Sequence, residues 1–115
     1  MSNLAKKQCT PCKGGMPSLT KEAAAALLND LSGWQIIQDH HLSKEFAFEN
    51  FVTALEFVNS VGAVAEEQGH HPDIYLTWGK ARIDIWTHKI DGITESDFIL
   101  AAKIDNLCLT RTIHE

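Results

Sequence analysis

The sequence has little of what marks secreted, membrane-spanning or nucleic-acid-binding proteins. It contains three cysteines in 115 residues, and its first residues include no apolar stretch of the kind that signal peptides carry. No apolar run approaches the roughly 18 residues that a membrane span needs. Its 10 basic residues are outnumbered by 15 acidic ones, whereas phosphate binding requires a basic surface. We therefore expect a cytoplasmic protein that binds neither membranes nor nucleic acid.

Two of the cysteines, Cys9 and Cys12, form a C-x-x-C pair of the kind found in zinc sites and redox motifs. Zinc usually takes four ligands, however, and the third cysteine stands alone. A redox motif should begin a helix, but a segment with two glycines and a proline follows here. We interpret residues 1–18 as a flexible tail and residues 19–115 as a single domain. Deletion of residues 1–15 should leave the activity within a few-fold.

What is present is an alternation of helix and strand patterns along one domain. The apolar spacing predicts seven elements in the order α-β-β-α-β-β-α, an α+β fold in which helices pack on one face of a four-stranded antiparallel sheet. Thr20 and Asn50 are suited to cap the first two helices, and Gly69 to end the second. A two-residue type II′ turn is expected at Gly79–Lys80. The expected helices are 21–31, 51–68 and one starting near Thr94, and the expected strands are 34–38, 42–48, 74–78 and 81–87.

Two adjacent histidines, His70 and His71, follow the second expected helix between Gly69 and Pro72, a residue that cannot continue a helix. Glu66 precedes His70 by four residues, so both lie on the same side if the last turn stays helical. Histidines in this position can simply bind the last helix carbonyls. The adjacent pair with a carboxylate upstream favours a site that exchanges protons near neutral pH.

Two further candidates come later in the chain. His88 stands at the end of the last expected strand, where a loop begins. Asp97 follows Thr94 by three residues, the spacing of a capping box. Asp97 is therefore a helix cap, a site residue or both, whereas Thr94 needs no role beyond capping.

The histidines have two other interpretations. Glu66, His70, His71 and His88 could together bind zinc, but adjacent histidines point in different directions and the helical H-x-x-x-H pattern is absent, so we expect no metal. A second pair, His40–His41, occupies an expected turn with only Asp39 and Gln38 nearby. We interpret this pair as solvated surface and expect no kinetic effect when it is replaced by alanine.

Two segments closely resemble the pterin-4a-carbinolamine dehydratases: FAFENFVTALEFVNSVGAVAEEQGHHPD at residues 46–73 and THKIDGITESD at residues 87–97. The family motif is an acid, three intervening residues, His-His-Pro, an aromatic residue soon after, Thr-His, and then Gly and Asp. Here the motif residues are Glu66, His70, His71, Pro72, Tyr75, Thr87, His88, Gly92 and Asp97. The resemblance extends over roughly residues 19–113, and the family fold agrees with the element order expected above.

The resemblance implies dehydration of 4a-hydroxytetrahydrobiopterin to quinonoid dihydropterin and water, in tetrahydrobiopterin recycling, without a metal or a redox cofactor. His70 would be the general acid at the 4a-hydroxyl, and His71 and His88 would flank and bind the pterin. His88 could protonate a hydroxyl on the opposite face. Glu66 and Asp97 would orient these imidazoles. The expected substrate-binding residues are Gly69, His70, His71, Trp86, Thr87, His88 and Lys89, with Trp86 bulkier than the small residue of some relatives.

Other functions remain open within the same family. A dehydratase-like protein could act on another pterin, for example in molybdopterin metabolism, and some animal relatives are dimerisation cofactors of a homeodomain transcription factor. The complete set of three histidines and two carboxylates favours the enzyme, because a binding module would not need all five. Family members assemble as homodimers or homotetramers, and an edge strand such as 42–48 could pair between subunits.

Overall fold

Three helices and four strands follow one another in the expected order, after a short helical turn near the N-terminus. The computed structural model describes residues 4–9 and 18–114, and the side chains of those up to residue 107. The elements are η1 (Leu4–Lys6), α1 (Lys21–Leu28), β1 (Gln35–Ile37), β2 (His41–Ala47), α2 (Phe51–Gln68), β3 (Asp73–Thr77), β4 (Lys80–Ile85) and α3 (Glu95–His114). The predicted order α-β-β-α-β-β-α is confirmed.

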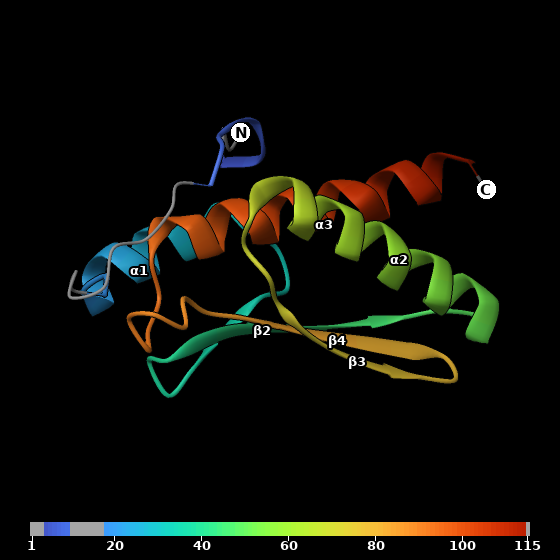
Figure 1. Cartoon of the computed structure of the whole chain (residues 1–115), viewed down its shortest axis with the longest axis horizontal. Coiled ribbons are helices and arrows are strands. Elements are labelled where there is room, and N and C mark those ends of the chain that lie inside the picture. Colours follow the sequence, from blue (N-terminus) through green and yellow to red (C-terminus); the bar gives the residue numbers. More distant parts are fainter. Residues whose placement is uncertain (1–3, 10–17, 115) are drawn as a thin grey trace.

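The four strands form one antiparallel sheet in the order β1-β2-β4-β3. Helices α1, α2 and α3 lie on one face of this sheet, and no described helix covers the other (Figure 1). The register places Leu42 opposite Ile85 and Phe46 opposite Ala81, and all four side chains are buried. Because side chains alternate along a strand, the alternate residues Ser43, Glu45, Arg82 and Asp84 belong to the uncovered face.

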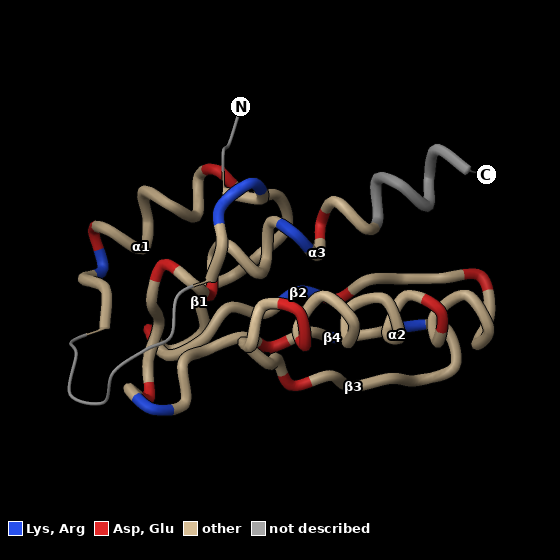
Figure 2. Tube along the Cα trace, turned by 45° about the horizontal axis from the view of Figure 1, so that its top comes forward, with Lys and Arg blue, Asp and Glu red and all other residues tan. Residues whose placement is uncertain are grey.

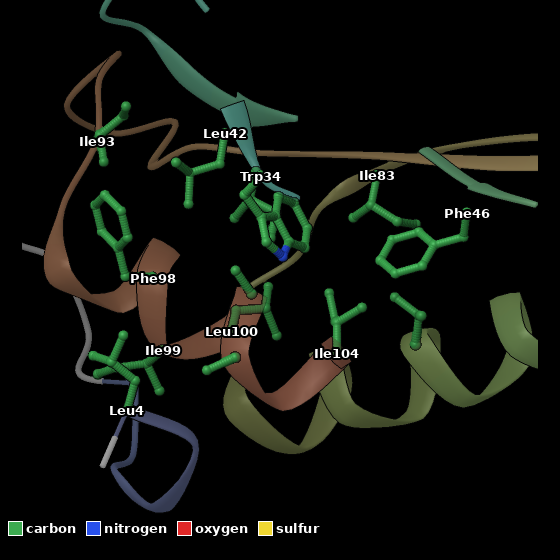
Figure 3. Close-up of a cluster of buried hydrophobic side chains, with 14 of the residues drawn as sticks. Leu4, Trp34, Leu42, Phe46, Ile83, Ile93, Phe98, Ile99, Leu100 and Ile104 are labelled. Atoms are coloured by element: carbon green, nitrogen blue, oxygen red, sulfur yellow. The ribbon is translucent and has the colours of Figure 1, made fainter. Parts of the chain in front are cut away.

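The core lies between the sheet and α3. Figure 3 shows Leu42, Phe46 and Ile83 from the sheet facing Leu100 and Ile104 from α3. All of these side chains are buried. Removal of this apolar area from water is the main contribution to the stability of the layer arrangement.

One charged residue interrupts the apolar face of β2. The Lys44 ammonium lies 2.9 Å from Oδ1 of Asp105 on α3, and the indole N–H of Trp34 donates to the same carboxylate at 3.0 Å. The Lys44 cation also lies over the Phe46 ring, 4.8 Å from its centroid. The interruption is therefore a paired charge that ties the sheet to α3.

The N-terminal residues depart from the expected flexible tail over the part that is described. Leu4 is buried in the core cluster with Ile99 of α3, Lys103 donates to the Ala5 carbonyl at 2.8 Å, and the Cys9 N–H donates to Gln68 at 2.9 Å. Sequence reasoning missed this packing because one leucine in a polar segment has no periodicity. Residues 10–17, and with them Cys12, lie outside the described residues.

The hairpin between β3 and β4 turns one residue earlier than expected. Thr77 pairs with Lys80, so the central residues are Trp78 and Gly79, and Gly79 is not among the residues with positive φ. The type II′ prediction at Gly79–Lys80 is therefore wrong. A Cβ at Gly79 would lie 3.1 Å from the Phe48 carbonyl oxygen, so glycine is needed here for a close approach to the end of β2.

Charge is dispersed over the described chain. Figure 2 shows Lys and Arg positions interspersed with Asp and Glu positions, without a long basic stretch. No helix in residues 4–9 and 18–114 is both long enough and apolar enough to cross a membrane.

Candidate active site

The end of α2 determines where His70 lies. Asn50 caps the start of this helix through the Thr53 N–H, and Gly69 ends it in the left-handed conformation at φ 65°, as the sequence predicted. The His70 N–H then donates back to the Ala65 carbonyl at 3.2 Å. The left-handed residue turns the chain out of the helix, and the His70 side chain meets the first turn of α3.

Asp97 at that first turn is fully buried. Its Oδ2 accepts from the Thr94 N–H at 2.7 Å and from the Thr87 hydroxyl at 3.0 Å. Its Oδ1 accepts from Nε2 of His70 at 2.5 Å. Asp97 is thus both a helix cap and a hydrogen-bond partner of His70, and its role as a site residue stays a prediction.

This arrangement fixes the tautomer of His70. The Asp97 oxygens are acceptors, so the proton of the neutral imidazole sits on Nε2 and Nδ1 is left to take up or release a proton. The side chain of His70 is only 13% exposed, which limits its rotation. A carboxylate that orients an imidazole in this way is the arrangement used in histidine general acid–base catalysis.

The second predicted imidazole belongs to a more exposed pair. Nε2 of His71 lies 2.6 Å from Oε2 of Glu66, with side chains 60% and 79% exposed. The sequence placed Glu66 beside His70, and the structure pairs it with His71 instead. The reason is Gly69, whose left-handed backbone turns His70 away from the helix face that carries Glu66.

The segment after β4 passes beside Asp97. Thr87 is buried and forms an isolated β-bridge with Gly92, while its hydroxyl bonds Asp97 and the Thr94 hydroxyl. His88 follows it on the surface, past the end of β4, and its ring lies against Trp86 with centroids 4.3 Å apart. Thr87 therefore joins the His70–Asp97 pair to the loop that carries His88.

The remaining predicted residues lie around this group. Gly69 and Lys89 are exposed, and a Cβ at Gly69 would meet no atom within 4 Å, so only its positive φ restricts it. Sequence reasoning missed the hydroxyl of Thr94, which was assigned to capping alone. The available signal was the position of Thr94, three residues before the candidate acid Asp97. The contact of the Thr94 hydroxyl with Thr87 could not be predicted, because it depends on the fold.

The histidine pair His40–His41 is not the solvated surface that the sequence suggested. Nε2 of His40 lies 2.7 Å from Oδ1 of Asp91, and the side chain is 33% exposed. The His41 side chain is 21% exposed. Both rings contact Trp86, which local sequence could not reveal because β2 and β4 are distant in the chain.

Comparison with known proteins identifies the family of this chain. The family model "Pterin 4 alpha carbinolamine dehydratase" matches residues 17–107. This chain belongs to the pterin 4-alpha-carbinolamine dehydratase family. Its place in the family makes it a hydro-lyase, an enzyme that removes water from its substrate.

Relatives and solved structures extend the likeness over most of the chain. It is 57% identical to a provisionally named pterin-4-alpha-carbinolamine dehydratase of Rubrobacter xylanophilus over 93% of this chain and all of that protein. A protein of the same provisional name from Alkaliphilus metalliredigens is 50% identical, with 91% and 96% covered.

Two solved structures share the fold. The transcriptional coactivator/pterin dehydratase of Brucella melitensis matches with a TM-score of 0.75 at 28% identity, over 78% of this chain and 97% of that one. A pterin dehydratase-like protein described as a RuBisCO assembly factor in the alpha-carboxysome matches with a TM-score of 0.57 at 26% identity, over 65% of this chain and 88% of that one. The fold is thus found in proteins whose names state more than one role.

Proposed function

We propose that this dehydratase converts 4a-hydroxytetrahydrobiopterin to quinonoid dihydropterin and water, within tetrahydrobiopterin recycling. The observation that carries the proposal is the imidazole of His70 held by a buried carboxylate, Asp97, at 2.5 Å. The family supplies the class of substrate, a pterin carbinolamine. The reaction needs one proton delivered to the departing hydroxyl and one removed from N5, which histidines can do near neutral pH.

The proposed step balances without any other reagent. His70 enters the step as the imidazolium, with a proton on each ring nitrogen. The N5 lone pair forms the C4a=N5 bond, the C4a–O bond breaks, and the hydroxyl takes the Nδ1 proton of His70 to leave as water, which leaves His70 as the neutral Nε2–H imidazole. N5 loses its proton to a base, which restores the starting charge of the substrate. The Nε2–H of His70 stays bonded to Asp97 throughout, so the ring cannot rotate away from the hydroxyl.

The other two imidazoles would complete the site. His71, paired with exposed Glu66, and His88, which lies on Trp86, would flank and bind the pterin together with Gly69 and Lys89. His88 would serve a hydroxyl presented from the opposite face, so the two 4a epimers would depend on different histidines.

The first experiment is a stopped-flow assay of the wild-type protein with synthetic 4a-hydroxytetrahydropterin. We expect the quinonoid product to form much faster than in the spontaneous reaction, because one positioned general acid alone contributes roughly 10²–10⁴-fold. A rate equal to the uncatalysed rate would exclude 4a-hydroxytetrahydropterin as a substrate of this protein. It would favour the alternatives, which are another pterin substrate or a protein-binding role. The buried His70–Asp97 pair favours the enzyme, since a binding surface does not need a fully buried carboxylate.

We also propose that the chain forms a homodimer or homotetramer. Three apolar side chains on α2, Phe51, Val52 and Leu55, are 43%, 61% and 39% exposed, and a second copy would cover them. β2 is an inner strand, paired with β4 on one side and with β1 on the other. Because β1 pairs only with His41–Ser43, the later residues of β2 have an unpaired backbone edge on the β1 side, where a strand of a second copy could pair. Light scattering should give a mass of two or four chains, and Val52→Glu should lower it. A monomeric wild type would contradict this proposal.

A further inference from the structure

Trp86 stands at the centre of an aromatic group on the uncovered face of the sheet. Ring centroids of His88, His40 and His41 lie 4.3, 5.3 and 5.8 Å from its ring, and the planes of His88 and Trp86 differ by only 33°. The contact with Trp86 is the one ring contact that His88 makes in the described part of the chain. The orientation of the His88 imidazole therefore depends on where the indole lies.

The histidine pair that holds the indole is itself anchored by carboxylates. Nε2 of His40 lies 2.7 Å from Oδ1 of Asp91, and the Nδ1 atoms of His40 and His41 are 3.1 Å apart, so one of them donates to the other. Nε2 of His41 faces Asp84 at 4.0 Å.

Asp84 is buried, and it is the fixed end of this chain of contacts. It accepts from the Ser43 hydroxyl at 2.6 Å, and the Arg82 guanidinium lies 3.3 Å away. The hydrogen bond and the charged partner hold this buried carboxylate in place, because losing them would leave its desolvation uncompensated. The two imidazoles thus link the carboxylate of Asp91 to the carboxylate of Asp84.

Backbone strain is concentrated in the two loops that build this group. Gln38, Asp39 and Asp91 are the only non-glycine residues with positive φ in the described ranges, at 52°, 55° and 56°. Gln38 and Asp39 turn the chain directly into His40, and Asp91 is the residue that binds it. Backbone strain of this kind persists only where the surrounding structure holds the residue in place, and it is common beside functional sites.

We infer that His40 and His41 are positioning residues that, through Trp86, set the orientation of His88. The inference rests on the proposed function for its kinetic consequence, because it assumes that the His88 imidazole meets the pterin. His40 and His41 lie outside the motif that the family resemblance rests on. The inference also assigns a role to the bulky Trp86, whose indole contacts the His88 ring and orients it. The chain of contacts runs from Asp91 and Asp84 through the histidine pair to the indole.

The orientation is tested first by NMR, independently of catalysis. In the wild type, the indole ring current should shift the His88 ring protons upfield, because the ring centroids are 4.3 Å apart and the planes differ by only 33°. The double variant His40→Ala/His41→Ala should lose most of that shift, while the His70 ring signals stay unchanged and show that the fold and the His70–Asp97 pair are intact. An unchanged His88 signal in the folded double variant overturns the inference.

If the double variant does not fold, Asp91→Asn and His40→Phe take its place. Asparagine tolerates positive φ and keeps an acceptor for His40, so Asp91→Asn should retain the His88 shift. His40→Phe keeps a ring against Trp86 but loses the bond to Asp91, so it should reduce the shift. Equal spectra for the two variants overturn the role assigned to the bond between His40 and Asp91.

Kinetics then test the consequence for catalysis. On the 4a epimer that depends on His88, the double variant should lower kcat by about tenfold with KM little changed, the result of misplacing a group that acts in the transition state. Glu45→Gln is the matched control, since Glu45 lies on the same face of β2 and contacts Lys80 instead. A moved His88 ring with unchanged kcat overturns the positioning role. Absence of activity in the wild type overturns the proposed function and leaves the NMR result to decide the orientation.

Discussion

Replacement of Asp97 by asparagine tests the electrostatic arrangement of the site without changing its shape. The Thr94 N–H can only donate, so the amide oxygen of the new side chain must take the place of Oδ2, which accepts that bond at 2.7 Å. The amide NH₂ is then forced toward Nε2 of His70, which must become an acceptor. The proton of the neutral imidazole moves to Nδ1, the nitrogen that should exchange protons with the substrate, and the orienting negative charge is lost.

The expected effects on rate and on stability differ in size. An inverted tautomer in a carboxylate–histidine pair can lower kcat by about 10⁴-fold, and we expect about 10²-fold or more for Asp97→Asn with 4a-hydroxytetrahydropterin. The free energy of unfolding should fall by only about 1 kcal/mol, because the amide oxygen still caps α3. Stopped-flow assay, urea denaturation and ¹⁵N NMR of the His70 ring measure rate, stability and tautomer separately.

A second carboxylate on α3 provides the matched control. Asp105 is partly buried and binds Lys44 and Trp34, away from the histidines. Asp105→Asn should lower the unfolding free energy by about 1–2 kcal/mol with turnover unchanged. If Asp97→Asn keeps turnover within a few-fold while its His70 tautomer is inverted, the carboxylate is a helix cap only and the proposed role of the pair is refuted.

Three further predictions concern the exposed pair, metals and the N-terminus. His71→Ala and Glu66→Gln should each lower kcat/KM by about tenfold or less, because the pair is mostly in solvent; a loss as large as that of Asp97→Asn would contradict this order. Elemental analysis of the purified protein should find no stoichiometric zinc or iron, because Nε2 of both His70 and His71 already faces a carboxylate. One tightly held ion per chain, together with loss of activity on adding a chelator, would overturn the acid–base mechanism. Leu4→Ala should lower the unfolding free energy by about 2 kcal/mol, since Leu4 is buried; unchanged stability would mean that η1 contributes nothing to the fold.

Local sequence chemistry was sufficient for the order of the elements and for both ends of α2, whereas α1 ends at Leu28 and β4 at Ile85, before the expected residues 31 and 87. Asn50 before an apolar stripe and Gly69 after it predicted α2, and both cap the helix as expected. The β3–β4 turn was misplaced by one residue because Gly79 was taken as its first central residue, whereas it is the second. Glycine is favoured at position 79 because the Phe48 carbonyl oxygen approaches it closely, and Phe48 follows a strand that is distant in the sequence.

The residues of the candidate site were predictable, but their pairing was not. Glu66 was assigned to His70 from helical spacing, yet Gly69 breaks that spacing and His70 bonds Asp97 instead. The contacts of His40 and His41 with Trp86 depend on the register of β2 against β4. Alternation along β4 places Arg82, Asp84 and Trp86 on one face, which was the available signal that a polar cluster lies there.

The central claim is that His70, held by Asp97, protonates the departing hydroxyl, and the most direct measurement is dehydration of each 4a epimer by His70→Ala. Turnover of the epimer that His70 serves should fall by roughly 10²-fold, the usual contribution of a general acid, with native circular dichroism. His88→Ala should affect the other epimer more. Near-full activity of folded His70→Ala on both epimers would contradict the account and move the acid to His71 or to a bound water.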